Sequence, residues 1–139
     1  MNNIIIGDGA LGTELRDRGV EVPSHTESIW SALALTESPE EIKQIHLDYI
    51  EAGSDFITIN NYAVTQPLLE RVNRADELTD LTLKSIELGK DAIKESNKGI
   101  KLAGSLPPLE TSYRADLVQD RERMIEQYSE IAAILENKV

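Results

Sequence analysis

Short apolar runs alternate along this chain with longer segments whose apolar residues recur at helical spacing. The runs cover residues 4–6, 56–59 and 100–103, and a glycine or asparagine cluster follows each of them. Such short runs, bounded by turn-forming residues, predict strands. The runs show no sustained alternation of apolar and polar residues, so we expect both faces of the sheet to be covered.

The segments between these runs have the patterns of helices. Residues 10–18 predict a short helical turn that stops at Gly19, and residues 65–67 open another short piece. Residues 76–96 and 116–137 predict two longer helices with one apolar face each. The small residues of the first of these two faces, Ser85, Gly89 and Ala92, indicate close packing.

The clearest helix begins at Ser38. Serine can cap a helix, Pro39 suits the first helical position, and Glu41 stands three residues past the cap. The helix ends at Gly53. Five residues at spacings of three and four share its inner face: Ile42, Ile45, His46, Tyr49 and Ile50.

Strands that alternate with helices predict an α/β fold with parallel strands and right-handed crossovers. The stretch from residue 19 to residue 37 fits neither pattern, and we expect it to be irregular. It contains the only tryptophan, Trp30. Long connections in compact domains are often functional, so this stretch is a candidate part of a site.

Length and charge narrow the class of protein. The 139 residues are expected to form one domain, 1–139. A net charge of −11 argues against nucleic-acid and membrane-surface partners. No apolar run approaches the roughly 18 residues of a membrane span. The first residues have no basic region or cleavage site, so we expect a cytoplasmic protein.

The chain contains no cysteine, which excludes disulfides, thiolate zinc sites and a cysteine nucleophile within these residues. His25 and His46 cannot close a metal site alone. His46 lies on an apolar helix face and is expected in the core, whereas His25 lies in a loop and is expected to be solvated.

Polar residues follow each predicted strand. Asp8 and Gly9 follow the first strand, Asn60 and Tyr62 end the second, and Ser105 follows the third. The carboxyl ends of parallel strands meet at one edge of a sheet, where ligands bind in α/β folds. Asp8 could bind a substrate ammonium group there, and the Gly9 N–H could bind a carboxylate. Turn formation explains these residues equally simply.

Two further features have competing interpretations. Residues 7–12 place glycines at the first, third and sixth positions, as a dinucleotide-binding loop does, but the second strand with its acidic residue is missing at the required distance. Trp30 is either a packed anchor or an aromatic face for a cationic substrate such as a sulfonium.

Eight segments taken together resemble the homocysteine S-methyltransferase family. They stand in the family's order and spacing across essentially the whole chain, and they cover residues 8–15, 30–32, 38–40, 46–50, 52–55, 58–62, 103–108 and 112–114. The last segments are most similar to the branch that uses S-methylmethionine-type donors, whereas other relatives use betaine-type donors.

This resemblance implies a zinc-dependent (β/α)8 TIM barrel in which a zinc-bound homocysteine thiolate accepts a methyl group. The implied reaction moves the methyl group of a sulfonium donor such as S-methylmethionine to homocysteine and gives methionine, a step of methionine biosynthesis. The chain corresponds to the N-terminal half, with the first three βα units of an incomplete barrel.

The resemblance also assigns residues. Asp8 matches the residue that holds the homocysteine amino group, and Gly9 matches the N–H that approaches its carboxylate. Trp30 and Tyr62 match aromatic residues near the methyl donor. Asn60 and Ser105 are expected to face the same pocket, and no catalytic residue is assigned in this chain.

The family's zinc-binding cysteines and a second acidic residue for homocysteine have no counterpart in this sequence. We therefore expect no zinc bound through cysteines, and no activity of the chain alone. The open edges of half a barrel predict self-association or a complementary C-terminal segment. The residues expected to face that missing half are Ile4, Ile6, Ile57, Ile59 and Leu102.

Two other functions remain open from the sequence. One is a non-catalytic amino-acid-binding or assembly module that keeps Asp8 and Gly9. The other is an open α/β domain that binds a phosphate or nucleotide at residues 7–12.

Overall fold

A computed structural model of the protein describes residues 4–24 and 28–139. Its sheet contains two strands in the described residues, β1 (Phe56–Thr58) and β2 (Lys101–Ala103), which pair in parallel with Phe56 opposite Lys101. Gly7 forms a single parallel bridge with Phe56 on the other side of β1. The parallel α/β arrangement expected from the sequence is confirmed.

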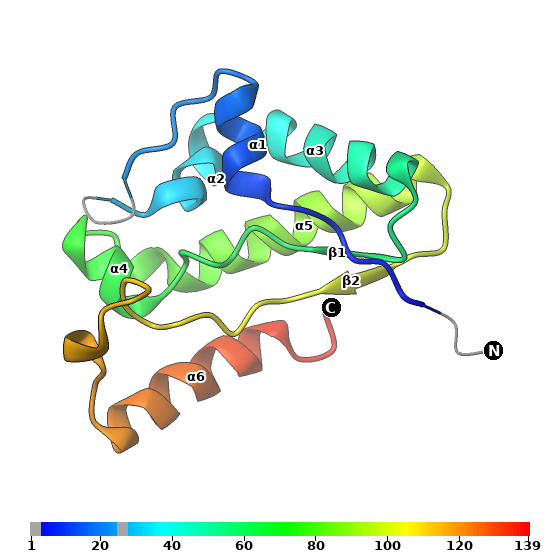
Figure 1. Ribbon diagram of the computed structural model, residues 1–139. Helices are drawn as coiled ribbons and strands as arrows, with labels where there is room; N and C mark the ends of the chain where they lie inside the picture. Colours follow the sequence, from blue (N-terminus) through cyan, green and yellow to red (C-terminus); the bar gives the residue numbers. More distant parts are fainter. Residues whose placement is uncertain (1–3, 25–27) are drawn as a thin grey trace.

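Three long helices, α3 (Pro39–Ala52), α5 (Leu78–Ser96) and α6 (Arg121–Leu135), cover the sheet, with α5 between the other two (Figure 1). The shorter helical elements are α1 (Leu11–Asp17), η1 (Trp30–Leu33), α2 (Ala34–Glu37), α4 (Gln66–Arg71), η2 (Ala75–Glu77) and η3 (Ala115–Leu117). Each predicted helix therefore exists, and the ends of α3 and α5 agree closely with the pattern.

The core forms where α5 lies on the sheet. Ile57 and Ile59 are fully buried there, and a Cβ added at Gly89 of α5 would stand 2.6 Å from Leu102 Cδ1. The predicted close approach at Gly89 is thus confirmed. The expectation that Ile57, Ile59 and Leu102 face a missing half is wrong, because all three side chains point toward Gly89 of α5.

The segment expected to form the first strand has a different structure. Residues 4–6 form no strand, and Ile4, Ile5 and Ile6 are 85%, 67% and 56% exposed. This segment is held on one side only, by hydrogen bonds from Ile6 N to Asp55 Oδ2 and from Asp55 N to the Ile6 carbonyl. The expectation of a covered strand at residues 4–6 is therefore wrong, whereas the exposure of Ile4 and Ile6 agrees with the expectation that they face a missing half.

Other differences are local. The stretch expected to be irregular contains η1 and α2, where Ile29 and Leu35 enter the core. Ser38 does not cap α3 with its side chain, although Pro39 and the left-handed Gly53 stand at the ends as predicted. The last helix begins at Arg121 rather than residue 116, because Asp120 accepts a hydrogen bond from Arg123 N and caps it. No helix of the described residues has the length and apolar character to cross a membrane.

Candidate functional site

A pocket of about 520 Å³ opens where the chain leaves β1 and β2 at their carboxyl ends. The six residues that the sequence singles out all line it: Asp8, Gly9, Trp30, Asn60, Tyr62 and Ser105. The structure therefore brings together every predicted site residue, from segments that are far apart in the chain. Their roles in binding a ligand stay predictions.

Asp8 faces the end of β1. Its Oδ2 accepts a hydrogen bond from Thr58 N at 2.8 Å, and its Oδ1 accepts one from the Thr58 hydroxyl at 3.0 Å. Burial raises the pKa of the Asp8 carboxyl above its ordinary value, although the Thr58 hydrogen bonds favour the ionised form. The carboxylate is thus fixed in direction and keeps acceptor capacity for a positively charged ligand group.

The three glycines near Asp8 each lie against an aromatic ring. A Cβ at Gly7 would stand 2.6 Å from Phe56, one at Gly9 would stand 2.6 Å from the Tyr49 hydroxyl, and one at Gly12 would stand 2.6 Å from Trp30. Ring packing therefore explains the glycine spacing at residues 7–12. The likeness to a dinucleotide loop has a different physical origin.

Asn60 holds the segment that carries Trp30. Its Oδ1 accepts a hydrogen bond from Ser31 Oγ at 2.9 Å, and its Nδ2 donates to the Ser31 carbonyl at 2.8 Å. Asn60 and Ser31 are both buried. The amide oxygen and the amide nitrogen thus each bond to Ser31, which fixes the segment that carries Trp30.

Trp30 and Tyr62 form an aromatic corner of the pocket. Their ring centroids are 6.2 Å apart and the rings meet edge to face at 76°. Trp30 has a φ of 46°, a left-handed conformation that is unfavourable for a bulky side chain. Residues held in such conformations occur where the surrounding structure over-determines them, and the Asn60–Ser31 pair supplies that restraint here.

The segment at residues 104–114, which we call the strap, forms another wall of the pocket. Asn61 exchanges two hydrogen bonds of 2.9 Å with the Ser105 backbone, and Thr65 donates to the Leu109 carbonyl at 2.7 Å. The Tyr62 hydroxyl is 2.8 Å from Ser112 Oγ. The chain that follows β1 therefore fixes the strap along its length.

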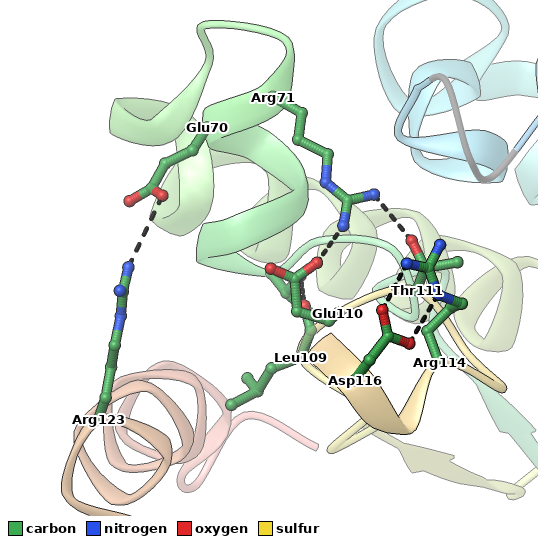
Figure 2. Close-up of polar contacts among 9 residues, drawn as sticks. Glu70, Arg71, Leu109, Glu110, Thr111, Arg114, Asp116 and Arg123 are labelled. Carbon is green, nitrogen blue, oxygen red and sulfur yellow. Dashed lines mark hydrogen bonds and ion pairs between the residues drawn. The ribbon is translucent and has the colours of Figure 1, made fainter. Parts of the chain in front are cut away.

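Arg71 of α4 fastens the middle of the strap. Its Nη1 donates to Thr111 Oγ1 at 2.7 Å, and its Nη2 forms an ion pair with Glu110 (Figure 2). A second cavity of about 650 Å³ lies between the strap and α6. Glu110 and Thr111 line both cavities, so the strap separates the pocket from the second cavity. Arg71 of α4 holds the strap at these two residues.

Sequence reasoning missed Thr58, Ser31, Arg71 and Glu110. Thr58 belongs to the strand-end cluster, so its position was a usable signal. Ser31, Arg71 and Glu110 carry no such signal, because their contacts join segments about 30 to 40 residues apart.

His46 is not among the residues that line the pocket. His46 is completely buried and lies in the core as predicted. Burial lowers its pKa to about 4, and neither ring nitrogen has a hydrogen-bond partner in the described part of the chain. The prediction for His25 lies outside the described residues.

The pocket does not suit the zinc ion that the family resemblance implies. The sequence holds no cysteine, and no three His, Asp or Glu side chains of residues 4–24 and 28–139 gather as metal ligands. Asp8 is engaged by Thr58, and among the described residues the only other acidic side chain lining the pocket belongs to Glu110. The residues present therefore do not fit the metal, and no chemical step is assigned to it here.

The fold and the pocket define the class: an α/β protein with a small-molecule pocket at the carboxyl ends of parallel strands. A family model described as homocysteine S-methyltransferase matches residues 5–139. The chain belongs to the homocysteine S-methyltransferase family.

Individual relatives agree with this assignment. The chain is 36% identical over 86 residues to homocysteine S-methyltransferase 1 of Arabidopsis thaliana. This alignment covers 61% of this chain and 26% of the relative. It is 38% identical over 92 residues to homocysteine S-methyltransferase of Escherichia coli (strain K12). That alignment covers 65% of this chain and 28% of the relative.

The solved structure of the homocysteine methyltransferase MmuM from Escherichia coli, in its metallated form, superposes with a TM-score of 0.81 at 28% identity. The superposition covers 99% of this chain and 51% of MmuM. The chain thus spans about half the length of the solved relative that it matches.

Proposed function

We propose that the chain supplies the substrate-binding half of a homocysteine S-methyltransferase that uses a sulfonium donor such as S-methylmethionine. One observation carries this proposal: Asp8, Trp30 and Tyr62 line the same pocket. A carboxylate and an aromatic pair are the groups that a substrate with both an ammonium and a sulfonium requires.

Each residue has a distinct role in this proposal. Asp8 binds the homocysteine ammonium group, and the Gly9 N–H binds its carboxylate. Trp30 and Tyr62 offer ring faces to the sulfonium of the donor. Held in line, the homocysteine sulfur, after losing its proton to solvent, forms a bond to the methyl carbon while the donor's carbon–sulfur bond breaks and its electron pair stays on the donor sulfur. Acceptor and donor both become methionine.

Residues 1–139 would then be the first three βα units of a (β/α)8 TIM barrel. Residues 4–6 would be its first strand, although they lack strand geometry in this chain, and β1 and β2 would be its second and third strands. The superposition on half of MmuM supports this assignment. The exposed Ile4, Ile5 and Ile6 support the proposal that self-association or a complementary C-terminal segment covers this edge.

The methyl transfer itself needs more than these residues provide. A thiol attacks a sulfonium as its thiolate, and no described side chain of the pocket is a cation that would stabilise the thiolate. We therefore propose that this chain binds both substrates and that transfer requires a segment with metal-binding thiolates, in the same or another polypeptide.

Calorimetric titration of the chain with homocysteine and with S-methylmethionine tests the binding proposal. We expect Asp8→Asn to weaken homocysteine binding at least tenfold, since the amide removes the charge opposite the ammonium. Asp55→Asn is the matched control, because Asp55 accepts a backbone hydrogen bond from Ile6 and lies outside the pocket. Equal affinities in all three proteins, or no binding by the wild-type chain, would contradict the proposal.

Light scattering coupled to size-exclusion chromatography tests the proposal that a second copy or a C-terminal segment covers the edge at residues 4–6. We expect a concentration-dependent dimer or larger assembly of the wild-type chain, and a shift toward monomer in the double variant Ile4→Lys/Ile6→Lys. A wild-type chain that stays monomeric at both low and high concentration, without gaining a partner when the C-terminal half of a homologue is added, would refute it.

A further inference from the structure

The pocket wall is negatively charged. Asp8 and Glu110 both line it, and no Lys, Arg or His is among its lining residues in the described chain. Three aromatic residues, Trp30, Tyr62 and Tyr113, complete this surface. A cavity with acidic and aromatic lining and no basic group favours a ligand with net positive charge.

Glu110 differs from Asp8 in how it is held. Asp8 uses both oxygens for hydrogen bonds from Thr58, whereas Glu110 gives only its Oε2 to Arg71. None of the hydrogen bonds among the described residues uses Glu110 Oε1. That oxygen therefore keeps its full capacity to face a ligand.

Arg71 stands behind Glu110 rather than in the pocket. Figure 2 shows its guanidinium reaching from α4 to Glu110 and Thr111 on the strap. Glu110 is among the residues that line the pocket and Arg71 is not, so the ion pair meets the pocket through its acidic partner. The two Arg71 bonds fix the position of Glu110 and Thr111 on the strap.

We propose that Glu110 is a specificity-determining residue that selects a positively charged methyl donor, and that Arg71 is its positioning residue. This inference rests on the proposed function, since it concerns the donor side of the same pocket. Asp8 recognises the ammonium group of homocysteine, the methyl acceptor. Glu110 distinguishes a sulfonium from the neutral thioether that lacks the extra methyl group and its charge.

Two ligands isolate this effect: S-methylmethionine and methionine have the same amino-acid group and differ in the sulfonium methyl and its charge. We expect the wild-type chain to bind S-methylmethionine more tightly than methionine in calorimetric titrations. In Glu110→Gln the affinity for S-methylmethionine should fall about five- to tenfold, while that for methionine changes less than twofold. The ratio of the two affinities cancels any general loss of folded protein.

Arg71 is tested by a double-mutant cycle. Arg71→Met should lower the affinity ratio in the wild-type background, because the carboxylate loses its fixed direction, but should leave the ratio unchanged in the Glu110→Gln background. If Arg71 only stabilised the fold, Arg71→Met would have the same effect on the affinity ratio in the wild-type and the Glu110→Gln backgrounds. Arg123→Met is the matched control. Arg123 forms an ion pair at 3.9 Å with Glu70, the residue before Arg71, and is not among the residues that line the pocket (Figure 2).

The outcomes separate the two proposals. A wild-type chain that binds neither ligand overturns the proposed function and this inference with it. A chain that binds both ligands, with the same affinity ratio before and after Glu110→Gln, overturns the role of Glu110 and leaves the proposed function standing.

Discussion

Asn60 and Ser31 exchange two buried hydrogen bonds, one through the Ser31 hydroxyl and one through its carbonyl. The pair ties the end of β1 to η1, where Trp30 has its left-handed backbone. The neighbouring Asn61 makes a similar double contact with the Ser105 backbone. Two consecutive asparagines thus hold the two loops on either side of the pocket.

Removal of the Asn60 amide should release Trp30. In Asn60→Ala the buried Ser31 carbonyl and hydroxyl lose their partner, which we expect to lower the free energy of unfolding by about 2–4 kcal/mol. Trp30 is the only tryptophan, so its fluorescence reports the pocket directly. Urea denaturation followed by circular dichroism gives the stability, and the native-state emission maximum should move to longer wavelength.

Ser31→Ala is the control for this experiment. It removes the hydroxyl bond alone and should cost about 1–2 kcal/mol, with a smaller change in emission. If Asn60→Ala left both the stability and the Trp30 emission at wild-type values, the proposed restraint on η1 would be wrong.

Gly12 should tolerate no side chain. A Cβ there would stand 2.6 Å from Trp30 Cζ2 and 2.9 Å from its Cη2, so Gly12→Ala must displace the ring or the first turn of α1. We expect a loss of roughly 1–3 kcal/mol, as for other overpacking substitutions. Chemical denaturation measures the loss, and Trp30 emission shows whether the ring moves. Gly99→Ala is the matched control, because nothing lies within 4 Å of a Cβ at Gly99, and it should leave both readouts near wild type.

The sequence was sufficient to predict elements whose signals are local. The apolar face of α3 and the cluster at Asn60 and Tyr62 are visible in the residues themselves. It was insufficient where burial depends on a distant segment: the aliphatic run at residues 4–6 has a strand pattern, yet it is hydrogen-bonded through Ile6 to Asp55 and remains exposed.

In the candidate site, too, the features with a local signal were predictable and the contacts between distant segments were not. The sequence pattern and the family resemblance placed all six predicted residues at one pocket. The groups that hold them in place could not be found in this way, because Ser31 and Arg71 act across long sequence separations. The periodicity of a helix says which face is buried, but it does not say which side chain of another segment the face meets.

The Thr58 hydroxyl should control the ionisation of Asp8. Its hydrogen bond to Oδ1 lowers the pKa of the carboxyl, in opposition to burial. Thr58→Val keeps the shape of the side chain and removes this bond, so the pKa of Asp8 should rise further. Binding of an ammonium ligand needs the ionised form, and the acid limb of the affinity profile should therefore move to higher pH.

Calorimetric titration with homocysteine from pH 4, just above the ordinary carboxyl pKa of 3.8, to pH 8 measures this shift. The backbone bond from Thr58 N remains in the variant, so affinity at the alkaline end should change little. Thr36→Val serves as a control, since the Thr36 hydroxyl bonds to the Leu33 carbonyl and lies outside the pocket. An unchanged acid limb in Thr58→Val would show that this bond does not set the charge of Asp8.

His46 should make the protein sensitive to acid. Burial lowers its pKa to about 4 from an ordinary value of 6.5, so between these values the unfolded chain binds a proton that the folded chain does not. Stability attributable to this histidine is complete above pH 6.5 and falls as the pH decreases toward 4. A shift of this size corresponds to a total loss of about 3 kcal/mol.

The variant His46→Leu separates this effect from the many carboxylates that titrate in the same range. Leucine fills a similar volume and leaves no unpartnered ring nitrogen in the core, so the variant should match or exceed wild-type stability at pH 7.5. The difference in the free energy of unfolding between the variant and the wild type should then grow in favour of the variant as the pH falls to 4.5. Urea denaturation at pH 7.5, 5.5 and 4.5 measures it. A difference that stays constant across these three pH values would mean that His46 takes up its proton in the folded state as easily as in the unfolded chain.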